Sequence, residues 1–200
     1  MKRVFLILTM PLISFSLYAQ DLPKQKEVGL TFSGLNNFGV TFRTGNAHSL
    51  WRFSTLFLYG SKESLEADSS ETKSENGGFA LKIGKEFRKP ITQNLSFRFG
   101  ADVSFEYFKY LNDVDDRSIS NNDNTRKKIT YGPGINLILG LNYTLGKSII
   151  LGAELLPFVH YTIGTNTDKS LYFGEAKSDI SGFSYGLSNT SALLSLAYQF

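Results

Sequence analysis

A strict alternation of apolar and polar residues restricts the fold of this sequence more than any other feature. Between positions 95 and 107 every second residue is apolar: Leu95, Phe97, Phe99, Ala101, Val103, Phe105 and Tyr107. The intervening residues, such as Arg98, Gly100 and Asp102, are small or polar. Successive side chains of a β-strand point to opposite faces. The pattern therefore predicts a strand with one face suited to lipid or a core and the other suited to water.

The same alternation recurs in the stretches 79–88, 129–145 and 149–163. The strands of a soluble β-sandwich also alternate, so the composition of the polar face is needed to distinguish a sandwich from a membrane barrel. Nine strand charges share that face: Arg43, Arg52, Lys82, Glu86, Arg88, Arg98, Asp102, Glu106 and Glu154. Only Lys85 and Lys109 fall on the apolar face, near predicted strand ends, where a lysine can reach the interface. A polar interior and an apolar exterior are typical of a transmembrane β-barrel.

Loop lengths support this prediction. Three long polar segments, Ser61–Gly77, Asn112–Lys127 and Thr165–Ser181, are separated by shorter connections at Gly45–Ser49, Lys89–Asn94 and Gly146–Ser148. Outer-membrane barrels have long extracellular loops and short periplasmic turns. The long segments are therefore predicted to be extracellular loops.

The strand count follows if both termini are periplasmic, because an odd number of strands must then precede the first long loop. Residues 27–44 must turn at Leu35-Asn36-Asn37, where Asn tolerates the positive φ of a tight hairpin. Gly182–Phe200 must be one strand, and a β-bulge at Asn189–Ser191 would explain its change of apolar parity. We therefore predict an all-β, eight-stranded, antiparallel up-and-down barrel.

Aromatic residues gather near the predicted strand ends, as in the interfacial girdles of membrane barrels. Those assigned to the lipid face are Trp51, Tyr59, Phe79, Phe87, Tyr107, Tyr131, Tyr143, Tyr161 and Tyr198.

The N-terminus has the order of a secretory signal peptide: Met1-Lys2-Arg3, an apolar run from Val4 to Leu17, and then Tyr18-Ala19-Gln20. The alternative is a membrane anchor, but the run is shorter than the roughly 20 residues of a spanning helix. We expect a signal peptide at 1–19, a periplasmic segment at 20–26 and the barrel at 27–200. Without cysteine the chain has neither a lipoprotein acylation site nor a disulfide.

Removing Lys2 and Arg3 with the signal peptide leaves 19 basic residues against 18 acidic ones. The mature chain is thus nearly neutral and has no basic patch interleaved with aromatics. This composition argues against nucleic-acid binding.

The chain ends in Leu194-Ser195-Leu196-Ala197-Tyr198-Gln199-Phe200, which alternates strictly and finishes on an aromatic residue. This terminus resembles the signal that the outer-membrane assembly machinery reads. Together with the Tyr-Ala-Gln end of the signal peptide and the Gly-rich strands, it resembles the outer-membrane β-barrel proteins common in Bacteroidetes. The resemblance implies an outer-membrane location, contact with outer-membrane lipid and lipopolysaccharide, and recognition of the C-terminal strand by the assembly machinery. We expect a monomer.

Few residues are candidates for chemistry. A His-x-Ser pair with a Glu would resemble the outer-membrane enzymes that deacylate lipid A, but here the hydroxyl two positions after His160 belongs to Thr162. The pair should face the lumen, however, so we expect a lumenal hydrogen bond rather than a nucleophile and base. His48 falls in a predicted turn and is expected to be solvated. We expect no catalytic residues and no enzymatic activity.

The segment 112–116 is rich in oxygen ligands and resembles a Ca²⁺ loop in this respect alone. It lacks the EF-hand Gly, and Asn124 stands where a bidentate Glu is needed. Arg117 and Lys127–Lys128 also compete for the carboxylates. We therefore expect neither a metal nor a cofactor.

The favoured function is a non-enzymatic barrel with a structural role or with loops that bind an unidentified extracellular ligand. The alternative is a narrow channel for ions or small solutes; a lipid-modifying enzyme ranks third. If opposed residues of the 82–102 hairpin have numbers summing to 184, Glu86 faces Arg98 and Lys82 faces Asp102. Such pairs would plug the lumen, because an eight-stranded interior is only wide enough for side chains.

Overall fold

The computed structural model describes residues 24–33, 38–67, 70–116, 124–171, 173–188 and 191–200. The expected signal peptide at 1–19 lies outside this range, as does the expected hairpin tip at Leu35-Asn36-Asn37. The described residues contain no helix long and apolar enough to cross a membrane.

The fold consists of antiparallel β-strands. They are β1 (Gln25–Phe32), β2 (Phe38–Asn46), β3 (Ser49–Ala67), β4 (Ser70–Pro90), β5 (Leu95–Asp116), β6 (Asn124–Leu145), β7 (Ile149–Leu155), β8 (Phe158–Ser170), β9 (Gly174–Gly186) and β10 (Ala192–Gln199).

Eight of these strands form a closed ring. Strands β1 to β7 pair in sequence, and β10 joins β7 to β1. The closure that an eight-stranded barrel requires is present, since Glu27–Phe32 of the first strand pairs with Leu194–Gln199 of the last. At its end, the amide of Phe200 donates to the carbonyl of Lys26 at 2.9 Å. The fold class predicted from the alternation is correct.

Two of the wall segments are interrupted. β7 and β8 are separated at Leu156–Pro157, because proline has no N–H to give to a strand ladder. The second interruption separates β9 from β10, where the sequence predicted a bulge within one strand Gly182–Phe200. That prediction is wrong: β9 pairs with β8, whereas β10 pairs with β7 and β1.

The two faces of the wall match the predicted pattern. On β6, Leu137 is 52% exposed on the outside, whereas its neighbour Ile138 is fully buried inside. All nine predicted inward charges face the interior; Glu106 is half-buried and the other eight are buried. Of the two lysines predicted on the apolar face, Lys85 places its Nζ over the ring of Trp51, 4.8 Å from the centroid. Lys109 pairs with Glu75 at 3.1 Å, beyond the apolar belt.

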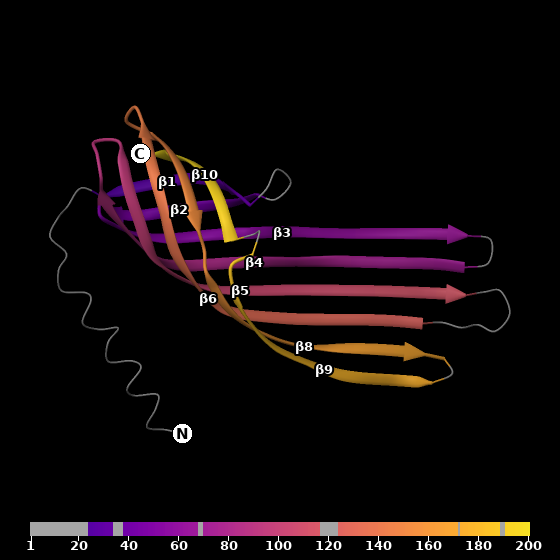
Figure 1. The fold of residues 1–200 in the computed structure, drawn as a ribbon. Helices are drawn as coiled ribbons and strands as arrows, with labels where there is room; N and C mark the ends of the chain where they lie inside the picture. Colours follow the sequence, from indigo (N-terminus) through magenta and orange to yellow (C-terminus); the bar gives the residue numbers. More distant parts are fainter. Residues whose placement is uncertain (1–23, 34–37, 68–69, 117–123, 172, 189–190) are drawn as a thin grey trace, which may run out of the picture.

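The three long polar segments are not loops, and this corrects the sequence prediction. Their described residues continue the wall as paired strands, so that β4 has 21 residues and β5 and β6 have 22 each. A tilted strand needs only about 9–11 residues to cross a bilayer. Beyond the aromatic level of Phe79, Tyr107 and Tyr131, strands β3, β4, β5, β6, β8 and β9 run on as one curved sheet, the outer sheet (Figure 1).

The register of the β4–β5 hairpin differs from the prediction by two residues. Opposed residues sum to 186, so Arg88 faces Arg98 and Gly84 faces Asp102. Turn geometry sets this register: the amide of Ile91 donates to the carbonyl of Leu95 at 2.8 Å. Glu86 and Arg98 share the inner face, as predicted, but lie diagonally rather than directly opposite.

One aromatic assignment also changes. The register of β3 against β4 slips between Thr55 and Phe57, and this slip reverses the faces of the residues that follow. Tyr59 thus lies opposite Gly78 on the inner face, with its ring centroid 6.4 Å from that of Phe108. The prediction that Tyr59 faces lipid is therefore wrong.

Candidate functional site

The lower lumen is filled by a charge-balanced cluster, which we call the lumen network. It consists of four guanidinium groups and four carboxylates: Arg43, Arg52, Arg88, Arg98, Glu27, Glu86, Asp102 and Glu154. They come from six strands, β1, β2, β3, β4, β5 and β7. An unpaired buried charge is strongly unfavourable, so the equal numbers matter for stability.

Arg52 and Glu154 occupy the centre of the lumen network. Arg52 Nη1 lies 2.6 Å from Glu154 Oε2, and Arg52 Nη2 lies 2.9 Å from Asp102 Oδ2. The same Glu154 oxygen is 2.9 Å from Arg98 Nη2. One carboxylate from β7 therefore joins β3 to β5 across the lumen.

A second group lies around Glu27. Arg88 donates to both Glu27 oxygens, at 2.5 and 2.8 Å, and its Nε donates to Glu86 at 2.7 Å. Arg43 lies 3.2 Å from both Glu27 and Glu86. These side chains occupy the interior, which in an eight-stranded barrel is just wide enough to be filled. The geometry favours a closed lumen over a wide aqueous pore.

Above the lumen network lies a cavity of about 190 Å³, the mouth pocket. It is lined by Lys82, Glu106, Asn136, Leu156, Phe158, His160, Ser188 and Ser191. Glu106 of the pocket pairs with Gly132, and the adjacent pair along β5 and β6 is Tyr107 with Tyr131. The pocket therefore lies at the level of the outer aromatic girdle.

His160 lies in the mouth pocket with polar neighbours on both ring nitrogens. Its Nε2 is 3.2 Å from Ser104 Oγ and 3.3 Å from Asn136 Oδ1, and its Nδ1 is 3.9 Å from Glu106 Oε1. The ring packs against the wall at Gly134, where any Cβ would overlap it. The expected lumenal hydrogen bond thus forms, with Ser104 and Asn136 as neighbours.

Ser104, His160 and Glu106 are residue types found in hydrolytic triads, but their arrangement does not meet the requirements. Ser104 is only 2% exposed and does not line the pocket, whereas a nucleophile needs access to substrate. The 3.9 Å between Nδ1 and Glu106 also exceeds hydrogen-bond distance. The cluster fits a hydrogen-bonded support for the pocket wall.

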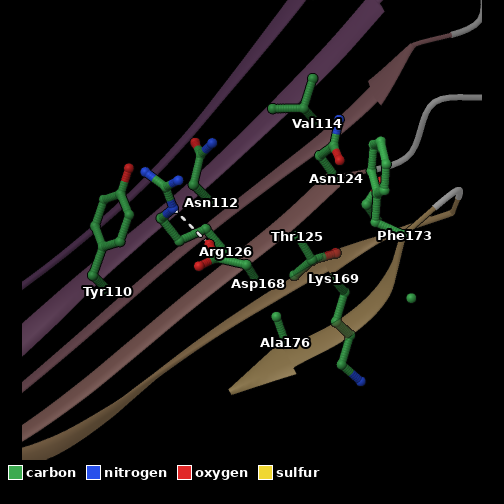
Figure 2. A pocket seen from close by; sticks show the side chains of 12 residues that line it. Tyr110, Asn112, Val114, Asn124, Thr125, Arg126, Asp168, Lys169, Phe173 and Ala176 are labelled. Atoms are coloured by element: carbon green, nitrogen blue, oxygen red, sulfur yellow. Dashed lines mark hydrogen bonds and ion pairs between the residues drawn. The ribbon is translucent and has the colours of Figure 1, made fainter. Parts of the chain in front are cut away.

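A third feature is a pocket of about 490 Å³ in the outer sheet, the outer pocket (Figure 2). Its side chains come from β5, β6, β8 and β9 and from the connection before β9: Tyr110, Asn112, Val114, Asn124, Thr125, Arg126, Asp168, Lys169, Ser170, Phe173 and Ala176. Arg126 Nε donates to Asp168 Oδ1 at 2.8 Å, the dashed line in Figure 2. That contact raises the pKa of the Arg126 guanidinium.

The candidate calcium segment belongs to β5, whose alternation sends Asn112 and Asp113 to opposite faces. Asn112 accepts a hydrogen bond from Ser74 Oγ at 2.8 Å, and Asp113 accepts one from Thr125 Oγ1 at 2.7 Å. Within the described ranges, no three His, Cys, Asp or Glu side chains converge as metal ligands would. His48 lies exposed in the turn between β2 and β3, as expected.

Three important residues did not emerge as site candidates from the sequence: Glu27, Ser104 and Asn136. Glu27 could have been found, because Gly29 and Thr31 continue its small, polar face. Nothing in the sequence marks Ser104 and Asn136 as neighbours of His160, since they lie 56 and 24 positions away.

No protein-family model and no curated protein sequence matches this chain. Among solved structures, the chain is similar to a major outer membrane protein from Thermus thermophilus, with a TM-score of 0.49, 12% identity, and 88% of this chain and 99% of that chain covered. It is also similar to Ail, the attachment invasion locus protein of Yersinia pestis (TM-score 0.36, 14% identity, 88% and 97% covered). CarO of Acinetobacter baumannii is similar with a TM-score of 0.35 and 14% identity, and the match covers 88% of this chain and 96% of that chain. The fold assignment rests on strand pairing rather than on these scores: the closed ring, apolar exterior and charged interior make the chain a transmembrane β-barrel of the bacterial outer-membrane type.

Proposed function

We propose that this protein is a non-enzymatic outer-membrane barrel that presents its outer sheet to a partner outside the cell. The observation that carries the proposal is the length of β4, β5 and β6, about twice what crossing a bilayer requires. A rigid scaffold that lifts a polar surface clear of the membrane suits recognition.

Two features of the outer sheet support binding. The outer pocket offers a cation and an anion, Arg126 and Asp168, beside the aromatic rings of Tyr110 and Phe173. Such a mixed lining suits a polar ligand with some apolar surface. Strand β9 is paired on one side only among the described residues, so its other edge is open to an added strand.

The lumen network argues against the channel alternative, because its side chains occupy the interior where ions would pass. The buried position of Ser104 argues against the lipid-modifying enzyme. Monomeric state, contact with lipopolysaccharide and membership of the Bacteroidetes-type family remain parts of this proposal, and they rest on the sequence.

The test is a cross-linked pull-down of surface ligands from intact cells on the refolded barrel. One variant lacks residues 166–178 and has an Asn-Gly turn in their place, which shortens β8 and β9 equally because Thr165 pairs with Asp179. The matched control lacks 62–75, where Ser61 pairs with Asn76, and keeps every residue of the outer pocket.

We expect the first variant to lose the captured partner and the control to retain it, with both barrels folded. Capture of the same partner by a barrel carrying both deletions would refute the proposal.

A further inference from the structure

The mouth pocket contains hydrogen-bond donors that no described residue satisfies. Lys82 is 4% exposed, yet its ammonium makes no ion pair or hydrogen bond with any described residue. Asn136 is 2% exposed, and its Nδ2 is buried without a hydrogen-bond partner. Both side chains line the cavity. The Lys82 ammonium opens to the cavity, where a ligand that supplies acceptors can reach it, and the burial of Asn136 Nδ2 is unfavourable as long as it has no acceptor.

Other charges around Lys82 do not neutralise it. Arg52, Asp102 and Glu154 lie below it in the lumen network, where the carboxylates pair with guanidinium groups. Glu106 also lines the pocket, but its carboxylate is directed at His160 Nδ1, 3.9 Å away. Among the described residues that line the pocket, Lys82 is therefore the cation available to an incoming group.

The wall beside the pocket is incomplete in the described part of the chain. Along β10, inward residues such as Leu193 and Ala197 are buried, as in a closed wall. From Ser181 to Ser188, by contrast, every residue is exposed, on both faces of the strand. Tyr185 is 76% exposed, and Phe183 is 64% exposed.

This open edge lies at membrane depth. Phe183 pairs with Tyr161, two residues below Ile163, which in turn pairs with Tyr131 of the aromatic girdle. An unpaired strand edge facing hydrocarbon leaves backbone groups unsatisfied. Ser188, at the end of the exposed run, also lines the mouth pocket, so the open edge leads directly to it.

We propose that the mouth pocket binds the phosphate group of an amphiphile whose chains remain in the outer leaflet beside β9. Lys82 and Asn136 donate to the phosphate oxygens, and Phe183 and Tyr185 contact the apolar chains. A lysine ammonium is a common phosphate ligand, and phosphate supplies several strong acceptors. This site is separate from the outer pocket, so the proposal does not depend on the function proposed above.

The test uses the refolded barrel in micelles of a non-ionic detergent without phosphate, so that the added compound is the source of phosphate. Phosphatidylglycerol is added in one arm and glycerol phosphate in the other, and binding is followed by ³¹P NMR and by native mass spectrometry. The variants are Lys82→Gln, Lys82→Arg and Asn136→Ala. Lys89→Gln is the matched control, because it removes the same charge from an exposed position on the same strand. Heat-modifiable migration on gels checks that each variant is folded.

We expect the wild type, Lys82→Arg and Lys89→Gln to bind, and Lys82→Gln to bind about tenfold more weakly or worse, as expected for loss of a charged hydrogen bond. Asn136→Ala should weaken binding to a smaller degree. Binding of phosphatidylglycerol alone supports the amphiphile, whereas equal binding of glycerol phosphate would overturn the role of the open edge. Folded wild type and Lys82→Gln with the same affinity in both arms would overturn the site itself.

Discussion

Replacing Glu154 by Gln tests whether the lumen network stabilises the barrel. The carboxylate faces two guanidinium groups, Arg52 Nη1 at 2.6 Å and Arg98 Nη2 at 2.9 Å, and it is 4% exposed. After the change, Arg52 keeps Asp102 at 2.9 Å, whereas among the described residues the carboxylate left to Arg98 is that of Glu86, at 3.9 Å. Arg98 becomes a buried charge without a close partner.

Removing one partner of a buried ion pair lowers the free energy of unfolding by about 3–5 kcal/mol. With a urea dependence of about 2 kcal/mol per molar, the unfolding midpoint should fall by about 1.5–2.5 M. Trp51, the single tryptophan, is 51% exposed on the outer face of β3 and reports unfolding by its fluorescence. The measurement is a urea titration of the refolded barrel in detergent or lipid.

Glu175→Gln is the matched control for this prediction. Glu175 also contacts two cations, Lys169 at 3.0 Å and Lys177 at 2.9 Å, but on the exposed strand β9. Exposed ion pairs contribute little, so its midpoint should not move measurably. The double variant Glu154→Gln with Arg98→Met should recover part of the lost free energy of unfolding, because it also removes the buried Arg98 charge that Glu154→Gln leaves without a close partner. Equal midpoints for Glu154→Gln and the wild type would refute the stabilising role.

Three further predictions concern conduction, assembly and ionisation. In planar bilayers the wild type should show little or no steady current and Arg52→Ala a larger one, because its guanidinium spans the lumen; a large, stable wild-type conductance would contradict the plug. Deleting Tyr198–Phe200 removes the last pairs to β1 and should leave the protein in the periplasm or degraded; normal heat-modifiable barrel in the outer membrane would show that closure does not need them. The hydrogen bond from Lys109 lowers the pKa of the Glu75 carboxyl below its ordinary value of 4.5. The contact between Lys109 and Glu75 should therefore be fully present above pH 4.5 and be lost as the pH falls through the lowered pKa. A ¹³C titration of the Glu75 carboxyl should show this midpoint, and Lys109→Met should return it towards the ordinary value.

The sequence alone was sufficient to predict the barrel, its two faces and its closure. Side-chain alternation is a local property of the strand, so the inward position of Arg98 and the outward position of Val103 follow from their neighbours alone. The pairing of the C-terminal strand with the first strand follows because an open edge in lipid is unfavourable. His160 was placed in the lumen by the same parity.

Register and strand length were decided by the tertiary structure. The β4–β5 pairing is two residues from the predicted one because the turn after Pro90 sets it, and charge pairing alone does not choose between opposed and diagonal neighbours. The segments 61–77 and 165–181 are polar on both faces, so they carry no alternation to mark them as strands. They became strands because a neighbour on the growing sheet offers each one a complete ladder of backbone hydrogen bonds.

The contacts across the lumen also depended on the closed ring. Arg52 meets Glu154 from a position 102 residues away, and Ser104 meets His160 over 56 residues. Alternation tells which side chains enter the lumen, but the tilt and stagger of the strands determine which of them share a level. The charges that fill the barrel were therefore determined by the sequence, and their partners by the geometry of closure.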